Sequence, residues 1–443
     1  MKKVYVLTLG CPRNLVDSEV LLGLLSDKGF DIVDTPESSD IAIVNTCGFI
    51  EDAKKESIDM ILHLADLKKI SVIKKLIVTG CLSQRYPEEL VKEIGEIDAV
   101  FGTSDFVKIP DMIERLITGK NIKEVANNPD FLYDHTFGRK LQTLSHYTYV
   151  KIQEGCSNKC SYCVIPDLRG PRRSRPSGSI IEEISILKKE HNIRELLIVG
   201  QDTTSYGMDL AGRSLLPELL TRAASVMDDG WIRLLYTHPA HFSDELIDVI
   251  AENRNICKYV DLPVQHINDR ILKKMNRRIT KDGITSLIKR IRARIDNATL
   301  RTSIIVGFPG ETDKEFDELL EYLQEIRFER LGAFIFSREE GTPAYRYKGQ
   351  VPDPVKNSRF DRVMALQQEI SAENNRKLLN KEITVLVDEA DPSDPGQFIC
   401  RGEMDAPEVD GVAYVRGEGV KPGEFINIRV TGTMEYDLIG DVV

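Results

Sequence analysis

The sequence predicts a multidomain α/β protein, in which a parallel α/β sheet domain is followed by a partial (β/α)6 barrel and a small antiparallel β-barrel. Three observations predict this order. Short apolar runs alternate with helical patterns before about residue 130, and they do so again between residues 145 and 350. After residue 380, short strands follow one another with only Asp, Pro and Gly between them, which is typical of a closed antiparallel barrel.

The composition limits the class of protein. Of the 443 residues, 42% are hydrophobic and 29% are charged, as in ordinary globular proteins. The formal net charge of -11 argues against binding nucleic acid through the whole surface, because phosphate binding needs a basic face. The apolar run 4–9 is too short for a signal peptide, and no later run could span a membrane. We expect a cytoplasmic protein whose eight cysteines stay reduced.

The N-terminal domain, residues 1–130, is expected to place three cysteines together. Its predicted strands are 4–9, 41–44, 76–78 and 99–101, and its clearest predicted helices are 17–28 and 51–67. Cys11, Cys47 and Cys81 follow the first three of these strands, and the carboxyl ends of parallel strands share one edge of a sheet. The small neighbours Gly10, Gly48 and Gly80 would allow close approach to a bulky inorganic ligand. Three unrelated core thiols remain the alternative.

A second α/β domain is predicted at residues 145–350, after a connection at residues 131–144. Its expected strands are 147–152, 195–199, 232–236, 259–262, 301–306 and 332–336. Each strand is followed by a helical stretch, so six units would form an incomplete barrel. The active site of such a barrel lies at the carboxyl ends of its strands.

The first of these strand ends carries Cys156, Cys160 and Cys163 at C-x-x-x-C-x-x-C spacing. This spacing can supply thiolates to three irons of a cubane cluster and leave the fourth iron without a protein ligand. A structural zinc site is an alternative, but it needs a fourth ligand, and the candidates His146 and Cys257 lack the usual paired spacing. A disulfide framework would need an oxidising compartment.

The remaining strand ends combine glycine with polar residues, a composition that suits a nucleoside or amino-acid moiety. They are residues 200–204, 263–266, 307–311 and 337–342. His238 and His241 are interpreted as structural, because no third ligand accompanies them. Two groups of basic residues are expected to form solvated faces. They are Lys273, Lys274, Arg277 and Arg278, and the set Lys159, Arg169, Arg172, Arg173 and Arg175, which could also receive an acidic substrate loop or phosphates.

The C-terminal part is predicted to contain a linker helix at residues 351–379 and a barrel at residues 380–443. The expected barrel strands are 383–387, 397–400, 411–415 and 425–430, and Cys400 would be a core thiol. Residues 380–443 contain fourteen acidic and five basic residues, a net charge of -9. A barrel of this charge would clamp RNA poorly.

The motif Cys156-x-x-x-Cys160-x-Tyr162-Cys163 resembles that of the radical S-adenosylmethionine superfamily. Together with the N-terminal cysteines and a final barrel similar to a TRAM domain, it makes the whole chain resemble the methylthiotransferase family. Residues 9–19 and 405–411 are similar to the branch that modifies an aspartate of small-subunit ribosomal protein twelve. The tRNA-modifying branch usually has Gly-Cys-Gln-Met-Asn at the first cysteine.

The resemblance implies two 4Fe-4S clusters. Cys156, Cys160 and Cys163 would hold the first, whose open iron binds S-adenosylmethionine, and one electron would then release a 5′-deoxyadenosyl radical. Cys11, Cys47 and Cys81 would hold the second, which would carry the sulfur that a second S-adenosylmethionine methylates. The residues implied around S-adenosylmethionine are Tyr162, Gln201, Asp202, Gly307, Gly310 and Glu311. No catalytic residue is assigned beyond the cluster ligands.

The predicted function is therefore a transferase that inserts a methylthio group at the β-carbon of an aspartate. Its partners would be ribosomal protein twelve, free or on the ribosome, an electron donor and a sulfur donor, with no membrane. The acidic C-terminal barrel suggests docking to a basic protein through complementary charge. A tRNA adenosine methylthiotransferase remains the alternative. An iron-sulfur electron carrier is a third reading, which the missing fourth cysteine at each site disfavours.

Overall fold

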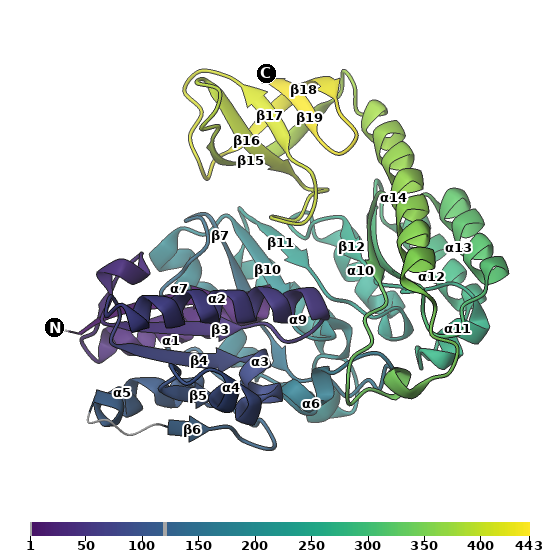
Figure 1. Cartoon of the computed structure of the whole chain (residues 1–443). Coiled ribbons are helices and arrows are strands. Elements are labelled where there is room, and N and C mark those ends of the chain that lie inside the picture. Colours follow the sequence, from purple (N-terminus) through teal and green to yellow (C-terminus); the bar gives the residue numbers. More distant parts are fainter. Residues whose placement is uncertain (1, 118–121) are drawn as a thin grey trace.

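The computed structural model describes residues 2–117 and 122–443. It consists of an N-terminal parallel sheet domain, a partial barrel and a small closed barrel that follows a long helix (Figure 1). The predicted fold class is confirmed. Among the described residues, no helix is long and apolar enough to cross a membrane.

The N-terminal sheet has six parallel strands in the order β2-β1-β3-β4-β5-β6. The strands are β1 (Lys3–Thr8), β2 (Asp31–Ile32), β3 (Ile41–Thr46), β4 (Lys75–Gly80), β5 (Ala99–Phe101) and β6 (Ile122–Glu124). The four predicted strands are confirmed, whereas β2 and β6 were not predicted. Both are edge strands of two or three residues, too short to show a periodic pattern. The order reverses between β1 and β3, which is where open α/β sheets bind ligands.

Helices cover both faces of this sheet. They are α1 (Pro12–Asp27), α2 (Glu51–Lys69), α3 (Cys81–Arg85), α4 (Pro87–Glu93) and α5 (Ile109–Ile117). Apolar residues of α2 and α4 pack on one face of the sheet, and those of α1 and α5 pack on the other. The core on the α1 side continues into the central domain, where it includes Tyr149, Leu197 and Tyr259. The N-terminal domain is thus joined to the central domain by shared apolar packing.

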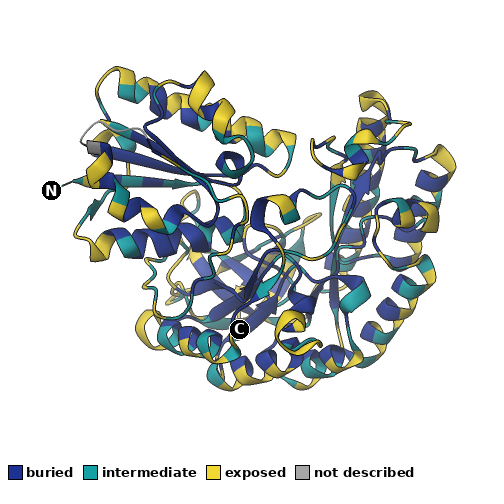
Figure 2. Ribbon diagram, turned by 90° about the horizontal axis from the view of Figure 1, so that it is seen from below, coloured by how far each residue is buried: buried dark blue, intermediate teal, exposed yellow. Residues whose placement is uncertain are grey.

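The central domain is an open barrel of six parallel strands. They are β7 (Tyr147–Lys151), β10 (Glu195–Val199), β11 (Trp231–Leu234), β12 (Tyr259–Asp261), β13 (Thr299–Val306) and β14 (Arg330–Ile335). They form the sheets β11-β10-β7 and β12-β13-β14, which a parallel bridge between Ile232 and Ile256 connects. All six predicted strands are confirmed within a few residues. Figure 2 shows that these strands are largely buried while the outer helices are exposed on one side.

Long helices surround the barrel, and shorter elements line its ends. The helices are α6 (Ile165–Arg169), α7 (Ser177–His191), α8 (Met208–Ala211), α9 (Leu216–Val226), α10 (Asp244–Glu252), α11 (Asp269–Lys274), α12 (Lys281–Arg294) and α13 (Asp313–Ile326). A two-stranded antiparallel ribbon, β8 (Gln153–Glu154) and β9 (Arg173–Ser174), flanks the loop with Cys156, Cys160 and Cys163. This ribbon closes the cysteine loop at its base.

The helix α14 (Asp353–Arg376) runs along the open edge of the barrel and leads to the C-terminal domain (Figure 1). The closed barrel consists of β15 (Glu382–Ala390), β16 (Gln397–Gly402), β17 (Ala413–Arg416), β18 (Phe425–Thr433) and β19 (Leu438–Val442), in the order β15-β16-β17-β19-β18. Four of these strands were predicted and β19 was not. Cys400 is fully buried in the core of this domain, as expected.

The C-terminal domain contacts the amino ends of the central strands, at the end opposite the cysteine loop. Arg401 pairs with Glu195 at 2.6 Å, and Asp405 pairs with Arg330 at 2.6 Å. The Tyr259 hydroxyl donates to Asp410 at 2.6 Å. Further contacts of this kind come from Asp388, Glu403 and Glu408. Five of the fourteen acidic residues of the C-terminal domain therefore contact the central domain.

Candidate active site

The three N-terminal cysteines lie at neighbouring strand ends. Cys11 precedes α1, Cys47 follows β3, and Cys81 is the first residue of α3. A Cβ atom added to Gly10 would lie only 2.7 Å from the Cys47 Cβ and 2.9 Å from its Sγ. Since Gly10 also has a φ of +90°, no other residue fits there without strain. The glycine allows two cysteine loops to approach each other.

The other two glycines act in the same way. A Cβ at Gly80 would meet the Thr46 carbonyl oxygen at 2.5 Å, and one at Gly48 would meet the Cys81 carbonyl carbon at 2.9 Å. These glycines were expected to allow close approach of an inorganic ligand. In the structure, they allow neighbouring backbone segments to approach each other.

Asn14 fastens the same loops together. Its side-chain amide donates to the carbonyl oxygens of Leu9 and Thr46, each at 3.0 Å. Its backbone carbonyl accepts a hydrogen bond from the Asn45 side chain at 2.9 Å. These bonds are buried, so replacing either amide would leave unpaired polar groups. The three strand ends are held as one unit.

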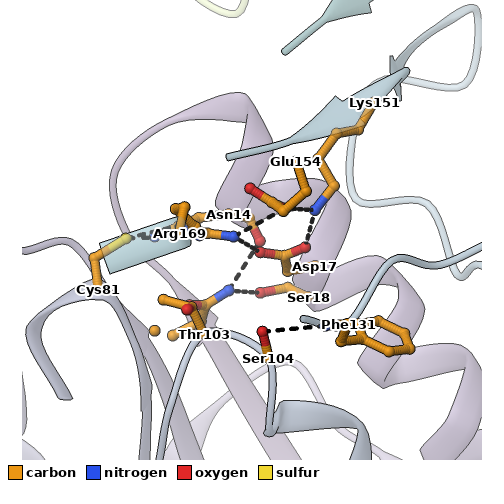
Figure 3. Close-up of polar contacts among 12 residues, drawn as sticks. Asn14, Asp17, Ser18, Cys81, Thr103, Ser104, Phe131, Lys151, Glu154 and Arg169 are labelled. Carbon is orange, nitrogen blue, oxygen red and sulfur yellow. Dashed lines mark hydrogen bonds and ion pairs between the residues drawn. The ribbon is translucent and has the colours of Figure 1, made fainter. Parts of the chain in front are cut away.

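Arg169, from α6 of the central domain, is the main cross-domain contact of this unit. Figure 3 shows its guanidinium between Cys81 and Asp17. Nη2 donates to the Cys81 Sγ at 3.6 Å, and Nη1 pairs with Asp17 at 2.6 Å. Lys151 of β7 binds Asp17 and also pairs with Glu154 at 2.5 Å. All these charged side chains are buried, and two cations face two carboxylates.

The thiols of the N-terminal triad differ in acidity. Burial opposes ionisation of Cys11, but the charges of Arg13 and Arg169 outweigh burial and lower its pKa. Burial raises the pKa of Cys47 to about 12 and also raises the pKa of Cys81. Iron binding needs thiolates, so loading this site would release protons.

The three barrel cysteines line a cavity of about 330 Å³ at the carboxyl ends of the barrel strands. Burial raises the pKa of Cys156 to about 11 and that of Cys163 to about 12. Arg277 lies beside this triad, with Nη1 3.8 Å from the Cys160 Sγ. Arg13, Phe49 and Ile50 of the N-terminal domain also line the cavity. One cavity thus reaches from the barrel cysteines to the N-terminal domain.

Ion pairs hold the N-terminal domain across the open side of the barrel. Glu339, in the loop after β14, accepts hydrogen bonds from Arg85 of α3 at 2.6 Å and from Lys54 of α2 at 3.1 Å. At the opposite edge, the Arg169 contacts attach the same domain next to β7. The N-terminal domain is therefore attached at both edges of the barrel and covers the cavity between them.

Two of the predicted S-adenosylmethionine contacts line the cavity. They are Tyr162 and Gln201. The Gln201 side-chain amide nitrogen donates to Glu154, whereas its buried carbonyl oxygen has no hydrogen-bond partner. Such an unpaired acceptor suits a ligand that brings its own donor.

The other predicted contacts have partners within the protein. Asp202 is buried, and its carboxylate accepts a hydrogen bond from Asn158 at 2.7 Å and pairs with His241 at 2.8 Å. Glu311 pairs with Arg359 of α14 at 3.1 Å. Gly307 and Gly310, in the same loop as Glu311, do not line the cavity. The binding of S-adenosylmethionine by these four residues stays a prediction.

His238 is a buried part of the cavity wall. Its Nδ1 accepts a hydrogen bond from the Ala240 backbone at 3.2 Å, and burial lowers its pKa to about 2. His238 is therefore neutral at physiological pH. The interpretation of His238 and His241 as structural residues stays a prediction.

The expectation of solvated basic faces is wrong for three arginines. Arg169, Arg175 and Arg277 are each less than 5% exposed. Arg175 pairs with Glu183 at 2.5 Å, so its charge is balanced by a carboxylate inside the domain. Local sequence could not indicate this burial, because the partners lie on other elements.

The cavity residues that were not predicted from the sequence include Arg13 and Tyr236. Arg13 stands two residues after Cys11, and Tyr236 follows β11. The position of Arg13 beside a candidate ligand was the available signal. Tyr236 gave none, because its unusual backbone conformation is not encoded in a local pattern.

That the six cysteines of the two triads hold iron-sulfur clusters stays a prediction. Among the residues that the structure describes, no three His, Cys, Asp or Glu side chains converge on one metal-ion position. In a cubane cluster each thiolate binds a different iron, so the three sulfurs need not converge. None of the eight cysteines forms a disulfide.

Comparison with known families matches three segments of the chain. Residues 3–102 match a family described as uncharacterized protein family UPF0004, residues 150–323 match the radical SAM superfamily, and residues 381–443 match the TRAM domain. The radical SAM match implies a 4Fe-4S cluster and S-adenosylmethionine as cofactors of the central domain.

Full-length relatives and solved structures are also similar. The chain is 45% identical over 443 residues to ribosomal protein uS12 methylthiotransferase RimO of Desulforamulus reducens, with 100% of both chains covered. It is 45% identical to the protein of the same name from Clostridioides difficile, covering 100% of this chain and 99% of the relative. The fold resembles that of the radical S-adenosylmethionine methyltransferase TsrM from Kitasatospora setae, with a TM-score of 0.56, 14% identity and 77% of each chain covered.

Proposed function

This chain belongs to the ribosomal protein uS12 methylthiotransferase RimO family, and from that premise we propose that it adds a methylthio group to the β-carbon of an aspartate in uS12. It is a sulfur-transferring radical S-adenosylmethionine enzyme. The observation that carries the proposal is the cavity that joins the barrel cysteines to the N-terminal domain.

The central domain would carry the radical chemistry. Cys156, Cys160 and Cys163 would hold a 4Fe-4S cluster, and their partly exposed positions on the cavity wall support this assignment. With S-adenosylmethionine bound, this cluster supplies one-electron chemistry that can remove hydrogen from an unactivated carbon. Tyr162 and the open acceptor of Gln201 would orient S-adenosylmethionine, and the covering N-terminal domain would exclude water.

The N-terminal domain would carry the sulfur. Cys11, Cys47 and Cys81 would hold a second 4Fe-4S cluster, an assignment supported by their position at neighbouring strand ends and by the close approach at Gly10. Arg169 would stabilise the thiolate of Cys81 by donating a hydrogen bond. An electron donor and a sulfur donor would complete the reaction, which we assign to the cytoplasm.

The substrate would be met on the cavity side of the molecule. Because five acidic residues of the C-terminal domain already contact the central domain, only its remaining acidic residues could attract a basic ribosomal protein. Charge complementarity would then assist encounter more than it would position the aspartate.

The test is an anaerobic reaction of the reconstituted full chain with S-adenosylmethionine, a chemical reductant and purified uS12. We expect 5′-deoxyadenosine and a uS12 mass increased by a methylthio group in place of hydrogen. A deletion strain separates the tRNA alternative, because it should lose the modification of uS12 and keep the methylthio groups of its tRNA. The reverse pattern would assign the chain to tRNA, and absence of 5′-deoxyadenosine would favour an electron carrier.

A further inference from the structure

We propose that Arg13 recognises the carboxylate of the target aspartate and so determines which side chain the enzyme accepts. This inference rests on the proposed function and deepens it, because it names the group that binds the reacting side chain. It follows from the position of Arg13, from the absence of a carboxylate partner for it among the described residues, and from the strained residue that contacts its guanidinium.

Arg13 lies between the two cysteine triads. It is the second residue of α1, two positions after Cys11, and its side chain lines the same cavity as Cys156 and Cys163. Nη1 donates to the Gly200 carbonyl oxygen at 2.9 Å, which fixes one edge of the guanidinium. The guanidinium also hydrogen-bonds to the Cys11 thiol, but an arginine has five N–H donors, so donors remain for a ligand.

Arg13 is a cavity cation without a carboxylate partner. Among the described residues, no Asp or Glu forms an ion pair with it, whereas Glu339 of the same cavity is bound by both Arg85 and Lys54. Arg277 also lacks a carboxylate, but it lies beside Cys160 and donates to the Pro263 carbonyl. On the N-terminal side of the cavity, Arg13 interacts with the Cys11 thiol and the Gly200 carbonyl, and no described carboxylate occupies its remaining donors, so it is available to an incoming carboxylate.

Tyr236 fixes the guanidinium from below. The guanidinium carbon lies 4.6 Å from the centre of the Tyr236 ring, a cation–π distance. Tyr236 has a φ of +60°, which is rare for a bulky side chain. Its backbone is held there by the Asp261 carboxylate, which accepts from its N–H at 2.7 Å, and by Thr203, whose N–H donates to its carbonyl at 3.0 Å. Strain of this kind is typical of functional sites.

The chemistry of the substrate fits this position. An arginine can bind both oxygens of a carboxylate at once, which fixes its plane as well as its position. In aspartate the carboxylate carbon is bonded directly to the β-carbon. A clamp on the carboxylate would therefore hold the reacting carbon one bond away, inside the cavity that both triads border.

The experiment measures binding of uS12 without turnover. Full-length enzyme, loaded with iron and sulfide, is mixed with S-adenosylmethionine but no reductant, and its affinity for labelled uS12 is compared with that for uS12 in which the target aspartate is asparagine. We expect wild type to prefer the aspartate form about tenfold or more, because a buried charge pair is lost with asparagine. In Arg13→Met this preference should fall to about one.

Two further variants keep the test decisive. Arg13→Gln removes the charge but keeps a polar side chain that donates hydrogen bonds, so it should lose the preference even if Arg13→Met folds poorly. Arg362→Met removes an equal charge from the exposed surface of α14, where Arg362 pairs with Asp317, and should keep the wild-type preference. An Arg13→Gln enzyme that discriminates as well as wild type would overturn the inference. Failure of wild type to modify uS12 would instead overturn the proposed function.

Discussion

The cysteines of the barrel lie within eight residues of one loop, whereas those of the N-terminal domain come from the ends of three strands. The first triad is therefore shaped mainly by its own loop. The second depends on strand register, on glycines where loops touch and on buried bonds of Asn14 and Arg169. The local triad of the barrel should lose its activity only when residues of its own loop are replaced. The distributed triad of the N-terminal domain should also lose its activity when the residues that hold its three loops together are replaced.

The largest effect is expected from the local triad. Cys156→Ala should reduce cleavage of S-adenosylmethionine to background, because two thiolates would remain for three irons. Production of 5′-deoxyadenosine in anaerobic, reductant-driven assays measures this. Cys257→Ala is the matched control, since Cys257 is buried in the core outside both triads, and it should retain cleavage.

The distributed triad should be separable from the first. Cys47→Ala should keep cleavage of S-adenosylmethionine while losing transfer of the methylthio group, because it removes a ligand only of the N-terminal site. Mass spectrometry of uS12 and quantification of 5′-deoxyadenosine in the same reaction compare the two activities. Equal loss of both would contradict the division of labour between the domains.

A support residue should damage the N-terminal triad without touching a ligand. Arg169→Gln removes one of the two described buried cations that pair with Asp17 and Glu154, which should lower the free energy of unfolding by about 3 to 5 kcal/mol. Urea titration of the full chain measures the loss. Iron content, measured with Cys156, Cys160 and Cys163 replaced by alanine, should also decrease.

The control for this effect is Arg362→Gln, which breaks an exposed ion pair with Asp317. It should cost about 0 to 1 kcal/mol, because solvent screens such pairs. If Arg169→Gln were no more harmful than this control, the buried network would not support the triad.

The smallest expected effect is a loss of folding stability at acidic pH. His238 is neutral in the folded chain, with a pKa lowered by burial to about 2, while in the unfolded chain it gains a proton below about pH 6.5. The unfolded state then binds more protons, so this histidine lowers stability as pH falls below that value. Between pH 7.5 and 5 the loss should approach about 2 kcal/mol. Unfolding of His238→Asn, whose amide oxygen can replace Nδ1, should show a weaker pH dependence.

Local patterns were sufficient for the strands that carry the site. The central strands are rich in apolar residues and are followed by helices, so their ends, and the Cys156 loop, could be predicted. The meeting of Cys11, Cys47 and Cys81 followed from the rule that parallel strands share an edge.

The supports of the site could not be predicted in the same way. Arginine is usually a surface residue, and the sequence around Arg169 and Arg277 does not indicate otherwise. Their burial is explained by interaction partners that lie on other elements of the fold. Tyr236 adopts its left-handed conformation because Asp261 and Thr203 hold it, and both are distant in sequence. Long-range electrostatics and strain depend on the completed fold.

The attachment of the C-terminal barrel has a consequence for shortened chains. Its carboxylates supply the counter-charges of Arg330 and Arg301, which are largely buried at the amino ends of the strands. Removing the domain would leave Arg330 without its anion and Arg301 with Asp261 alone, and it would open that end of the central barrel to water. The domain thus covers the amino ends of the barrel strands. A loss of activity in a truncated chain would therefore reflect impaired folding before it reflected impaired substrate binding.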